Sequence, residues 1–262
     1  MPELPDVETI ARMLRRRLRG RRIGGVELLT PSTIRHPDPA TFIRLIRGRR
    51  VLDVHRRGKY LLFRLDRDLT LAVHLRMTGD FKITSARAPL HPHTRVVFTV
   101  GRERLRFTDL RRFGHMDLLT PRQLEGLRGL AKLGVEPLGP AFTAECFRAI
   151  VHTHRTGLKA LLLRQDLIAG IGNLYADEIL WQSRLHPARS TETLGDRQIA
   201  ALHDRIRTVL DRAVRHLSRS ERPVGIFLDA REQDGRCPRC KRPLRVERIA
   251  GRTTYYCPRC QH

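Results

Sequence analysis

The pattern of apolar and polar positions along the chain changes twice. Between Asp6 and Arg19, apolar residues recur every three or four positions, which predicts an amphipathic helix with Asp6 as a suitable N-cap. From Ile23 to about Leu119, short apolar runs separated by Gly, Pro or Asp predict strands. These runs are VELL, VLDVH, YLLFRL, LTLAVHL, RVVFTV and ERLRFTDL. Helical spacing then returns, with helices expected over residues 122–133, 143–154, 174–183 and 196–217.

This succession predicts a protein of more than one domain. Several strands at short spacing are typical of a β-sandwich or barrel, and the later helices form a separate region. The segment SRSERP at 218–223 has the composition of an exposed linker. We therefore expect domains at residues 2–120, 121–223 and 224–262, which is reasonable for a chain of 262 residues.

The tail contains four of the five cysteines, as the pairs Cys237-x2-Cys240 and Cys257-x2-Cys260. The 16 residues between the pairs match the spacing of four-thiolate zinc sites, and four thiolates leave no position for a catalytic water. Two disulfides are the alternative, which a reducing cytosol disfavours. The chain shows no secretory signal and no apolar run near the roughly 18 residues of a membrane span, so we expect a cytoplasmic protein.

The charge of the chain indicates a polyanionic partner. There are 51 Lys and Arg residues against 27 Asp and Glu, which gives a formal charge of +24 and a pI near 11.4. Nucleic acid is the simplest partner for such a protein. Only five of the 51 basic residues are lysines, so a lysine at a special place deserves notice, because arginine cannot serve as an amine.

The chain opens with Met-Pro-Glu-Leu-Pro. Removal of the initiator methionine would leave Pro2 with a terminal secondary amine, which is a nucleophile able to form an iminium with a sugar C1′. Glu3 beside it is a suitable proton donor and acceptor. Taken alone, these residues can equally be the ordinary start of a helix.

Two further segments offer groups for binding phosphate. The turn AGIGN at 169–173 precedes a helix, where free backbone N–H groups attract anions, although many helix connectors contain glycine. Arg252 lies between the two cysteine pairs, where a β-hairpin tip would present it to DNA; a solvated turn arginine is the alternative.

Seven segments together resemble the formamidopyrimidine-DNA glycosylase family, which shares its fold with endonuclease VIII. In chain order they are PELPDVET, RRGKYLLF, HLRMTG, FTDLRRFG, LGVEPL, AGIGNLYADEILW and GRTTYYCPRCQ. They run in order from residue 2 to residue 261, so the resemblance covers nearly the whole chain.

The resemblance implies an α+β fold with an N-terminal β-sandwich flanked by helices, a helical helix-two-turn-helix domain and a four-cysteine zinc hairpin. It implies a bifunctional DNA glycosylase and AP lyase that excises damaged bases from double-stranded DNA and cleaves the abasic strand by β,δ-elimination. The expected partner is duplex DNA with damaged bases or abasic sites. One structural zinc ion, no membrane and a monomer are expected.

The resemblance also implies roles for particular residues. Pro2 matches the catalytic amine, Glu3 the acid/base residue, Lys59 a lysine needed for base removal, and Arg252 a phosphate-clamping arginine. The remaining implied residues contact DNA or order the site, and three of them (Met77, Arg111 and Phe113) fill the space left by the extruded nucleotide. The full DNA-contacting set is His91, Arg111, Asn173, Met77, Phe113 and Asp6.

Three features depart from the family pattern. Asp6 stands where glutamate is usual, and the interval 218–236 is shorter than the segment that caps a flipped purine. The loop HPHTR at 91–95 also differs; His91 and His93 suggest a second metal less strongly than a turn around Pro92. A preference for oxidised pyrimidines, a catalytically weak damaged-DNA binding protein and an unrelated zinc-ribbon regulator are the alternatives.

Overall fold

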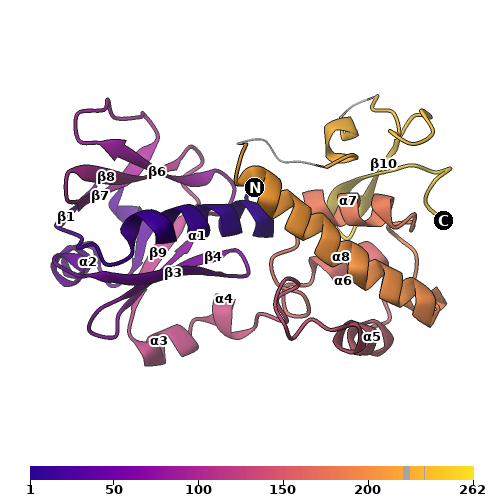
Figure 1. Cartoon of the computed structure of the whole chain (residues 1–262), viewed down its shortest axis with the longest axis horizontal. Helices are drawn as coiled ribbons and strands as arrows, with labels where there is room; N and C mark the ends of the chain where they lie inside the picture. Colours follow the sequence, from indigo (N-terminus) through magenta and orange to yellow (C-terminus); the bar gives the residue numbers. More distant parts are fainter. Residues whose placement is uncertain (221–224, 233) are drawn as a thin grey trace. The chain divides into compact units, whose positions relative to one another are not determined.

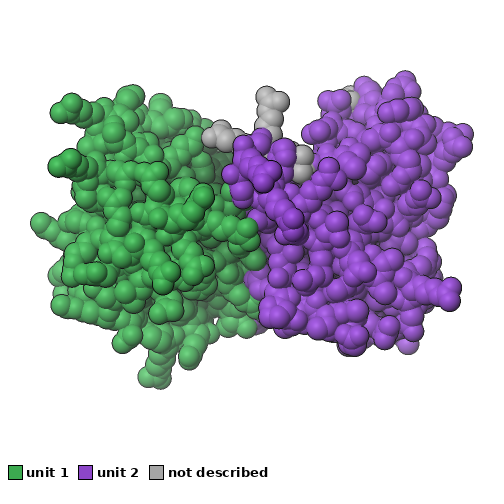
Figure 2. Space-filling view, viewed as in Figure 1, with its two compact units in different colours: residues 1–2, 7–131 green, residues 3–6, 132–262 purple. Residues whose placement is uncertain are grey.

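The computed structural model describes residues 1–220, 225–232 and 234–262, which form two compact units (Figure 2). Unit 1 comprises residues 1–2 and 7–131, and unit 2 comprises residues 3–6 and 132–262. Residues 221–224, which contain the expected boundary between 223 and 224 and the second half of the expected linker, lie outside the described residues. The division into three domains stays a prediction, and the segment 121–131 groups with unit 1.

Unit 1 contains two sheets, which confirms the predicted N-terminal β-sandwich (Figure 1). The first sheet has the order β1 (Gly25–Leu28), β7 (Thr94–Val100), β8 (Glu103–Asp109), β6 (Gly79–Ser85). The second has the order β2 (Ile34–His36), β9 (His115–Leu119), β5 (Thr70–His74), β4 (Tyr60–Leu65), β3 (Val51–Arg57). All neighbouring strands are antiparallel except β2 and β9, which are parallel.

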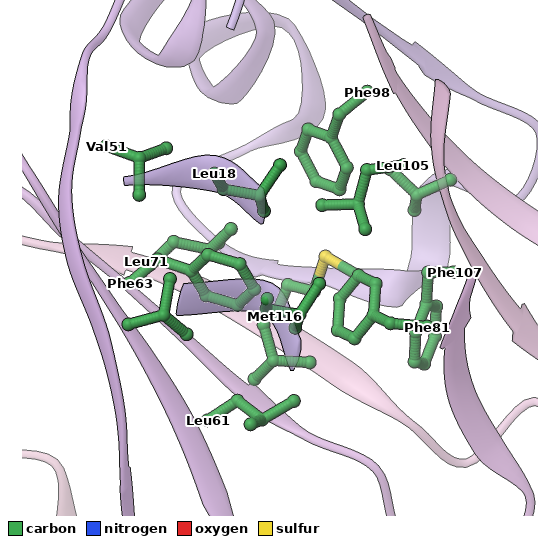
Figure 3. Close-up of a cluster of buried hydrophobic side chains, with 14 of the residues drawn as sticks. Leu18, Val51, Leu61, Phe63, Leu71, Phe81, Phe98, Leu105, Phe107 and Met116 are labelled. Atoms are coloured by element: carbon green, nitrogen blue, oxygen red, sulfur yellow. The ribbon is translucent and has the colours of Figure 1, made fainter. Parts of the chain in front are cut away.

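The core of unit 1 lies between these sheets (Figure 3). Phe63 from the second sheet packs edge-on against Phe81 from the first at 5.7 Å, and Phe81 lies 5.2 Å from Phe107. Helix α1 (Leu4–Leu18) adds Leu14 and Leu18 to the same cluster. Burial of large side chains from both sheets contributes roughly 1.5–3 kcal/mol for each, so this core holds the sandwich together.

The first helix begins earlier than the sequence pattern predicts. It starts at Leu4, and Asp6 lies within its first turn, where its Oδ2 accepts the Glu3 backbone N–H at 2.8 Å. The interpretation of Asp6 as the N-cap is therefore wrong. The carboxylate instead satisfies the N–H of the residue that precedes the helix, as the second half of a capping box does.

Two other helical features of unit 1 differ from the expectation from sequence. Helix α2 (Pro39–Ile46) interrupts the strands and was not predicted, although Asp38 caps it by accepting the Thr41 N–H at 3.0 Å. The helix expected over 122–133 is two short ones, α3 (Pro121–Glu125) and α4 (Arg128–Ala131), because the first ends at Gly126. A 3₁₀ turn, η1 (Pro31–Thr33), precedes β2.

Unit 2 contains three of the predicted helices and the cysteine-rich tail (Figure 1). Helices α5 (Ala144–Thr153), α7 (Asn173–Gln182) and α8 (Asp196–Leu217) confirm three of the expected segments. Helix α6 (Leu158–Leu163) was not predicted, because LKALLL is too short to show a helical period. The remaining elements are η2 (Thr191–Thr193), η3 (Leu228–Ala230), β10 (Arg245–Ile249) and β11 (Arg252–Tyr256).

Helix α7 is buried on all sides at the centre of unit 2. Tyr175, Ile179 and Leu180 are fully buried, and the long helix α8 packs its stripe of apolar residues, including Leu202 and Leu210, into the same cluster. A helix buried all round holds its first turn in place, and that turn carries the site described below. Among the helices that the structure describes, none is both long and apolar enough to cross a membrane.

Candidate active site and zinc centre

The Glu3 side chain forms the first feature of the site. Its carboxylate is buried and accepts three backbone N–H groups at the start of α7, from Gly172 at 2.9 Å, Leu174 at 2.8 Å and Tyr175 at 3.1 Å. These N–H groups have no partner within the helix, and the positive end of the helix dipole lies there, so the position suits an anion. The Gly172 N–H of the AGIGN turn and two N–H groups from the first turn of α7 therefore bind Glu3.

The glycines of this turn allow the approach. The Leu4 N–H donates to the Gly170 carbonyl at 3.0 Å, and Gly170 adopts a φ of +92°. A Cβ at Gly172 would lie 2.3 Å from the Glu3 carboxyl carbon, so any other residue would displace the carboxylate. These contacts attach Glu3 and Leu4 to the start of α7, and such attachment is what ties down a chain end.

The neighbours of Glu3 complete this part of the site. Asp6 holds the Glu3 backbone through the hydrogen bond given above, which supports an ordering role. Pro2 precedes Glu3 directly and is partly buried. The structure includes Met1, so the Pro2 nitrogen is here part of a peptide bond; as the chain end it would carry the amine one residue from the Glu3 carboxylate.

Asn173 and the zinc hairpin meet in the same unit. The Asn173 side-chain amide donates to the Thr253 carbonyl at 3.0 Å, one residue from Arg252. Arg252 is exposed and follows a two-residue turn in which Ala250 and Gly251 both have positive φ, as a type I′ hairpin requires. Folding thus brings Glu3, Asn173 and Arg252 to one region, and Arg252 lies at the tip of the hairpin as expected.

A buried ion pair that the sequence analysis missed fixes this hairpin. Lys159 of α6 contacts Asp177 of α7 at 2.6 Å, and both side chains are fully buried. Lys159 also donates to the Thr254 hydroxyl at 2.7 Å, while Asp177 accepts the Tyr255 N–H at 3.2 Å and pairs with Arg231 at 2.9 Å. Burial lowers the pKa of Lys159 and raises that of Asp177. The scarcity of lysine was the available signal.

The four tail cysteines converge on one point. All four sulfur atoms lie within 4.8 Å of one another, with Cys237 to Cys260 at 4.0 Å and Cys240 to Cys257 at 3.5 Å. A tetrahedral zinc ion with Zn–S bonds of about 2.3 Å separates its sulfurs by about 3.8 Å, so the four thiols fit this metal. No other cluster of three or more potential ligands occurs in the described part of the chain.

The only tryptophan of the chain packs against this zinc centre. The Trp181 indole N–H of α7 donates to the Cys237 sulfur at 3.4 Å, and its ring stacks on Phe227 at 5.4 Å. The Arg239 guanidinium lies 4.3 Å from the centroid of the Trp181 ring. The zinc tail and α7 thus share one small core, which is held by the cysteines.

We expect a chelator to release about one zinc per chain and to unfold the tail, because structural zinc supplies the folding free energy of such short units. Tryptophan emission should shift to the red as Trp181 loses Cys237 and Phe227, while circular dichroism of the β-sandwich is retained. Zinc release is followed with a chromogenic chelator. An unchanged emission after complete zinc loss would contradict the structural role of the metal.

Lys59 lies at a hairpin tip in unit 1. Arg57 and Tyr60 pair across the two-residue turn Gly58-Lys59, and Gly58 has a φ of +55°, as a type II′ turn requires. Arg56 secures this hairpin to α1 through Glu8 at 2.9 Å. The tight two-residue turn therefore fixes the backbone of Lys59 between β3 and β4.

Two histidines that the sequence analysis passed over lie beside this hairpin. Across neighbouring strands, His74 packs edge-on against Tyr60 at 4.6 Å and stacks on His115 at 5.6 Å. Burial, reinforced by nearby Arg76, lowers the pKa of His74 to about 3, and burial lowers that of His115 to about 4. Both rings are therefore neutral near pH 7. Alternating strand positions gave no signal that distinguished them from core residues.

The side chains predicted to fill the space left by the extruded nucleotide lie on two neighbouring loops of unit 1. Met77 is 37% exposed and Phe113 51% exposed, which is high for large apolar residues. The Arg111 guanidinium lies 4.8 Å from the centroid of the Phe113 ring. Leu110 on the same loop is 58% exposed and was not singled out from the sequence. Exposed apolar groups beside arginine suit insertion between bases.

His91 lies on a third loop of the same unit. The His93 N–H donates to His91 Nδ1 at 3.2 Å, the Thr94 N–H donates to the His91 carbonyl at 2.9 Å, and His91 is exposed. The loop is therefore the expected turn around Pro92, and the His91 ring is accessible.

Comparisons with known proteins agree with this architecture. Residues 1–116 match the family model of the formamidopyrimidine-DNA glycosylase N-terminal domain, residues 133–222 that of the H2TH domain, and residues 235–262 a zinc finger found in FPG and IleRS. The formamidopyrimidine-DNA glycosylase of Pelotomaculum thermopropionicum is 41% identical, covering 100% of this chain and 99% of the relative. The formamidopyrimidine-DNA glycosylase of Moorella thermoacetica is 44% identical, covering 99% of this chain and 92% of the relative.

Solved structures give the same result. A complex between Lactococcus lactis Fpg and a DNA containing an abasic site superposes with a TM-score of 0.89 at 31% identity, covering 99% of each chain. These matches define a helix-two-turn-helix protein with a C-terminal zinc finger, so the four cysteines form one structural zinc site. The chain belongs to the formamidopyrimidine-DNA glycosylase family.

Proposed function

We propose that the protein is a base-excision repair enzyme, a bifunctional DNA glycosylase and AP lyase that acts on oxidised bases in duplex DNA. The relatives that bear the glycosylase name and the Lactococcus lactis complex with abasic-site DNA support this function. The position of the Glu3 carboxylate carries the catalytic assignment. Three backbone N–H groups hold this carboxylate, and Glu3 directly follows Pro2, which becomes the terminal amine.

The reaction begins at the terminal amine. The lone pair of the Pro2 nitrogen attacks C1′ of the damaged nucleotide, and the base leaves with the electron pair of its bond to C1′ and is protonated by water. Glu3 takes the proton that the Pro2 nitrogen loses and passes it to the sugar ring oxygen, which opens the ring and leaves an iminium between Pro2 and C1′. Loss of a C2′ proton expels the 3′ phosphate, a second elimination expels the 5′ phosphate, and hydrolysis frees the amine.

The remaining residues bind and deform the DNA. Lys59, Asn173 and Arg252 supply donors to backbone phosphates, and Lys59 does so near the reacting sugar. Met77, Arg111 and Phe113 occupy the space left by the extruded nucleotide and so recover part of the few kcal/mol that extrusion costs. His91 joins the DNA-contacting set, and Asp6 keeps Glu3 in place.

Borohydride trapping tests the function directly. The protein is incubated with duplexes that contain 8-oxoguanine, formamidopyrimidine, thymine glycol or an abasic site, and the iminium is reduced to a stable covalent adduct. We expect an adduct with the abasic duplex and with at least one lesion. If no duplex gives an adduct, the chain is a damaged-DNA binding protein without catalysis.

Replacement of Arg252 by alanine tests the phosphate clamp. Loss of one phosphate contact should weaken DNA binding by about tenfold and reduce the slope of log K against log salt by about 0.9. Fluorescence anisotropy with an abasic-analogue duplex at several salt concentrations measures both. Arg248→Ala is the matched control, since Arg248 is exposed on the partner strand β10 and pairs with Thr253. Equal effects of both substitutions would contradict the clamp.

We further propose a cytoplasmic monomer in a bacterial cell, bound to DNA. A reducing compartment keeps the four thiols available for zinc. The lesion preference rests on the interval 218–236, which includes undescribed residues, so the lesion panel above determines whether oxidised purines or, as in endonuclease VIII, oxidised pyrimidines are favoured.

A further inference from the structure

The buried residue Asp109 contacts the loops that carry the predicted DNA-binding side chains, and the proposed reaction gives it no role. Asp109 ends β8 and is 1% exposed. Its neighbours belong to three loops of unit 1, which carry Met77, His91, and the pair Arg111 and Phe113.

The first two loops meet at the side chain of Asp109. The Thr78 hydroxyl, next to Met77, donates to Asp109 Oδ1. The Arg111 N–H donates to the Thr78 hydroxyl oxygen at 3.0 Å and to Asp109 Oδ1 at 3.2 Å, and the Gly114 N–H donates to Asp109 Oδ2 at 2.7 Å. The carboxylate therefore binds both ends of the Arg111–Phe113 segment and the turn that carries Met77.

The third loop meets the backbone of Asp109. The Asp109 N–H donates to the His93 carbonyl at 2.9 Å, and the buried Arg95 donates from Nε to the Asp109 carbonyl at 2.8 Å. The turn that presents His91 is thus attached to the same residue. The other two loops also contain strained residues. Arg76, beside Met77, has a φ of +58°, and Arg112, between Arg111 and Phe113, has a φ of +57°, and such backbone conformations need support from their surroundings.

We propose that Asp109, with Thr78 as its relay, is a positioning residue that holds these three loops in fixed mutual positions, so that their side chains enter DNA as one preformed set. The proposal rests on the proposed function, because it concerns extrusion of the damaged nucleotide. Preformed loops lose less conformational freedom on binding, and so more of the contact energy is available to offset unstacking. Asp109 itself touches neither DNA nor the reacting atoms.

Two near-isosteric substitutions test the relay. Asp109→Asn replaces one acceptor by a donor that faces N–H groups, and Thr78→Val removes the hydroxyl that joins Asp109 to Arg111. Thr78→Ser keeps that hydroxyl. Thr84→Val is the matched control, because the Thr84 hydroxyl on β6 is buried without a hydrogen-bond partner in the described part of the chain.

Each variant is assayed on a duplex with a paired formamidopyrimidine lesion and on a duplex with an abasic site. We expect Asp109→Asn and Thr78→Val to slow base removal by about tenfold or more, and to slow cleavage at the abasic site, where no base must be unstacked, by less than about threefold. Stopped-flow fluorescence of 2-aminopurine beside the lesion should show slower unstacking. Thr78→Ser and Thr84→Val should match the parent chain within about twofold.

Hydrogen exchange in the DNA-free protein tests loop positioning without catalysis. The Arg111 and Gly114 amides should exchange at least about tenfold faster in Asp109→Asn and Thr78→Val, because their acceptors are lost or weakened. Unchanged exchange, or equal loss of activity on both duplexes, overturns the proposal. A parent chain that cleaves neither duplex refutes the proposed function instead, and the exchange result then still decides whether Asp109 holds the loops.

Discussion

A chain in which the Pro2 nitrogen is blocked is expected to form no trapped adduct and to lose base removal by at least about 10³-fold, the scale of loss when a covalent nucleophile is removed. An amide nitrogen shares its lone pair with the carbonyl and does not attack C1′. The block is made by cleaving a tagged chain so that one glycine remains before Pro2, and base release is measured in single-turnover assays.

The matched control is the same tagged chain cleaved to leave Pro2 first. Both proteins should bind an abasic-analogue duplex with equal affinity, which separates loss of chemistry from loss of binding. Mass spectrometry of the trapped complex should locate the adduct on the terminal peptide. An adduct formed by the blocked chain would identify another amine; Lys59 is then the first to test, because Lys159 is fully buried and paired with Asp177.

Glu3→Gln is expected to slow base removal by about 10²–10⁴-fold, the contribution of a positioned acid/base group. Cleavage at a preformed abasic site should fall much less, because free abasic sugar already opens to an aldehyde that Pro2 can attack without ring protonation. The substitution also replaces one carboxylate oxygen by an NH2 group that faces N–H donors at the start of α7. We therefore expect a loss of about 1–3 kcal/mol in unfolding free energy.

Glu8→Gln is the control for loss of a nearby carboxylate, since Glu8 lies on α1, the helix that Glu3 directly precedes. Glu8 pairs with Arg12 and Arg56, and it should affect stability without separating the two substrates. Single-turnover rates on lesion and abasic duplexes, together with denaturant unfolding, provide the comparison. Base removal within a few-fold of the parent in Glu3→Gln would show that Glu3 only caps α7.

The features predicted well are those that depend on the spacing of residues within short segments of the chain. The 22-residue helix α8 was predicted with its observed bounds, because three- and four-residue apolar spacing continues over several turns. The zinc centre was predicted from two Cys-x2-Cys pairs, since each pair forms a tight knuckle whatever surrounds it. The motifs themselves identified the family before any contact was known.

Features that depend on packing were missed or misinterpreted. The AGIGN turn was predicted to bind phosphate, and nothing in the sequence indicated that its Gly172 N–H binds the Glu3 carboxylate, 169 residues away in the chain. Helix α6 carries the buried Lys159, yet six apolar-rich residues show no period. Tyr60, His74 and His115 lie on three different strands, and only the pairing of these strands brings their rings together.

The sequence by itself determined the β-sandwich, the main helices, the zinc ligands and the identity of the candidate groups, because residue spacing and thiol chemistry are properties of short segments. The tertiary structure alone decided that Glu3 caps α7, that Lys159 and Asp177 hold the zinc hairpin, and that Asp109 joins three loops. Those contacts link residues far apart in the chain, and only burial of polar groups in a packed core, where each must find a partner, selects them.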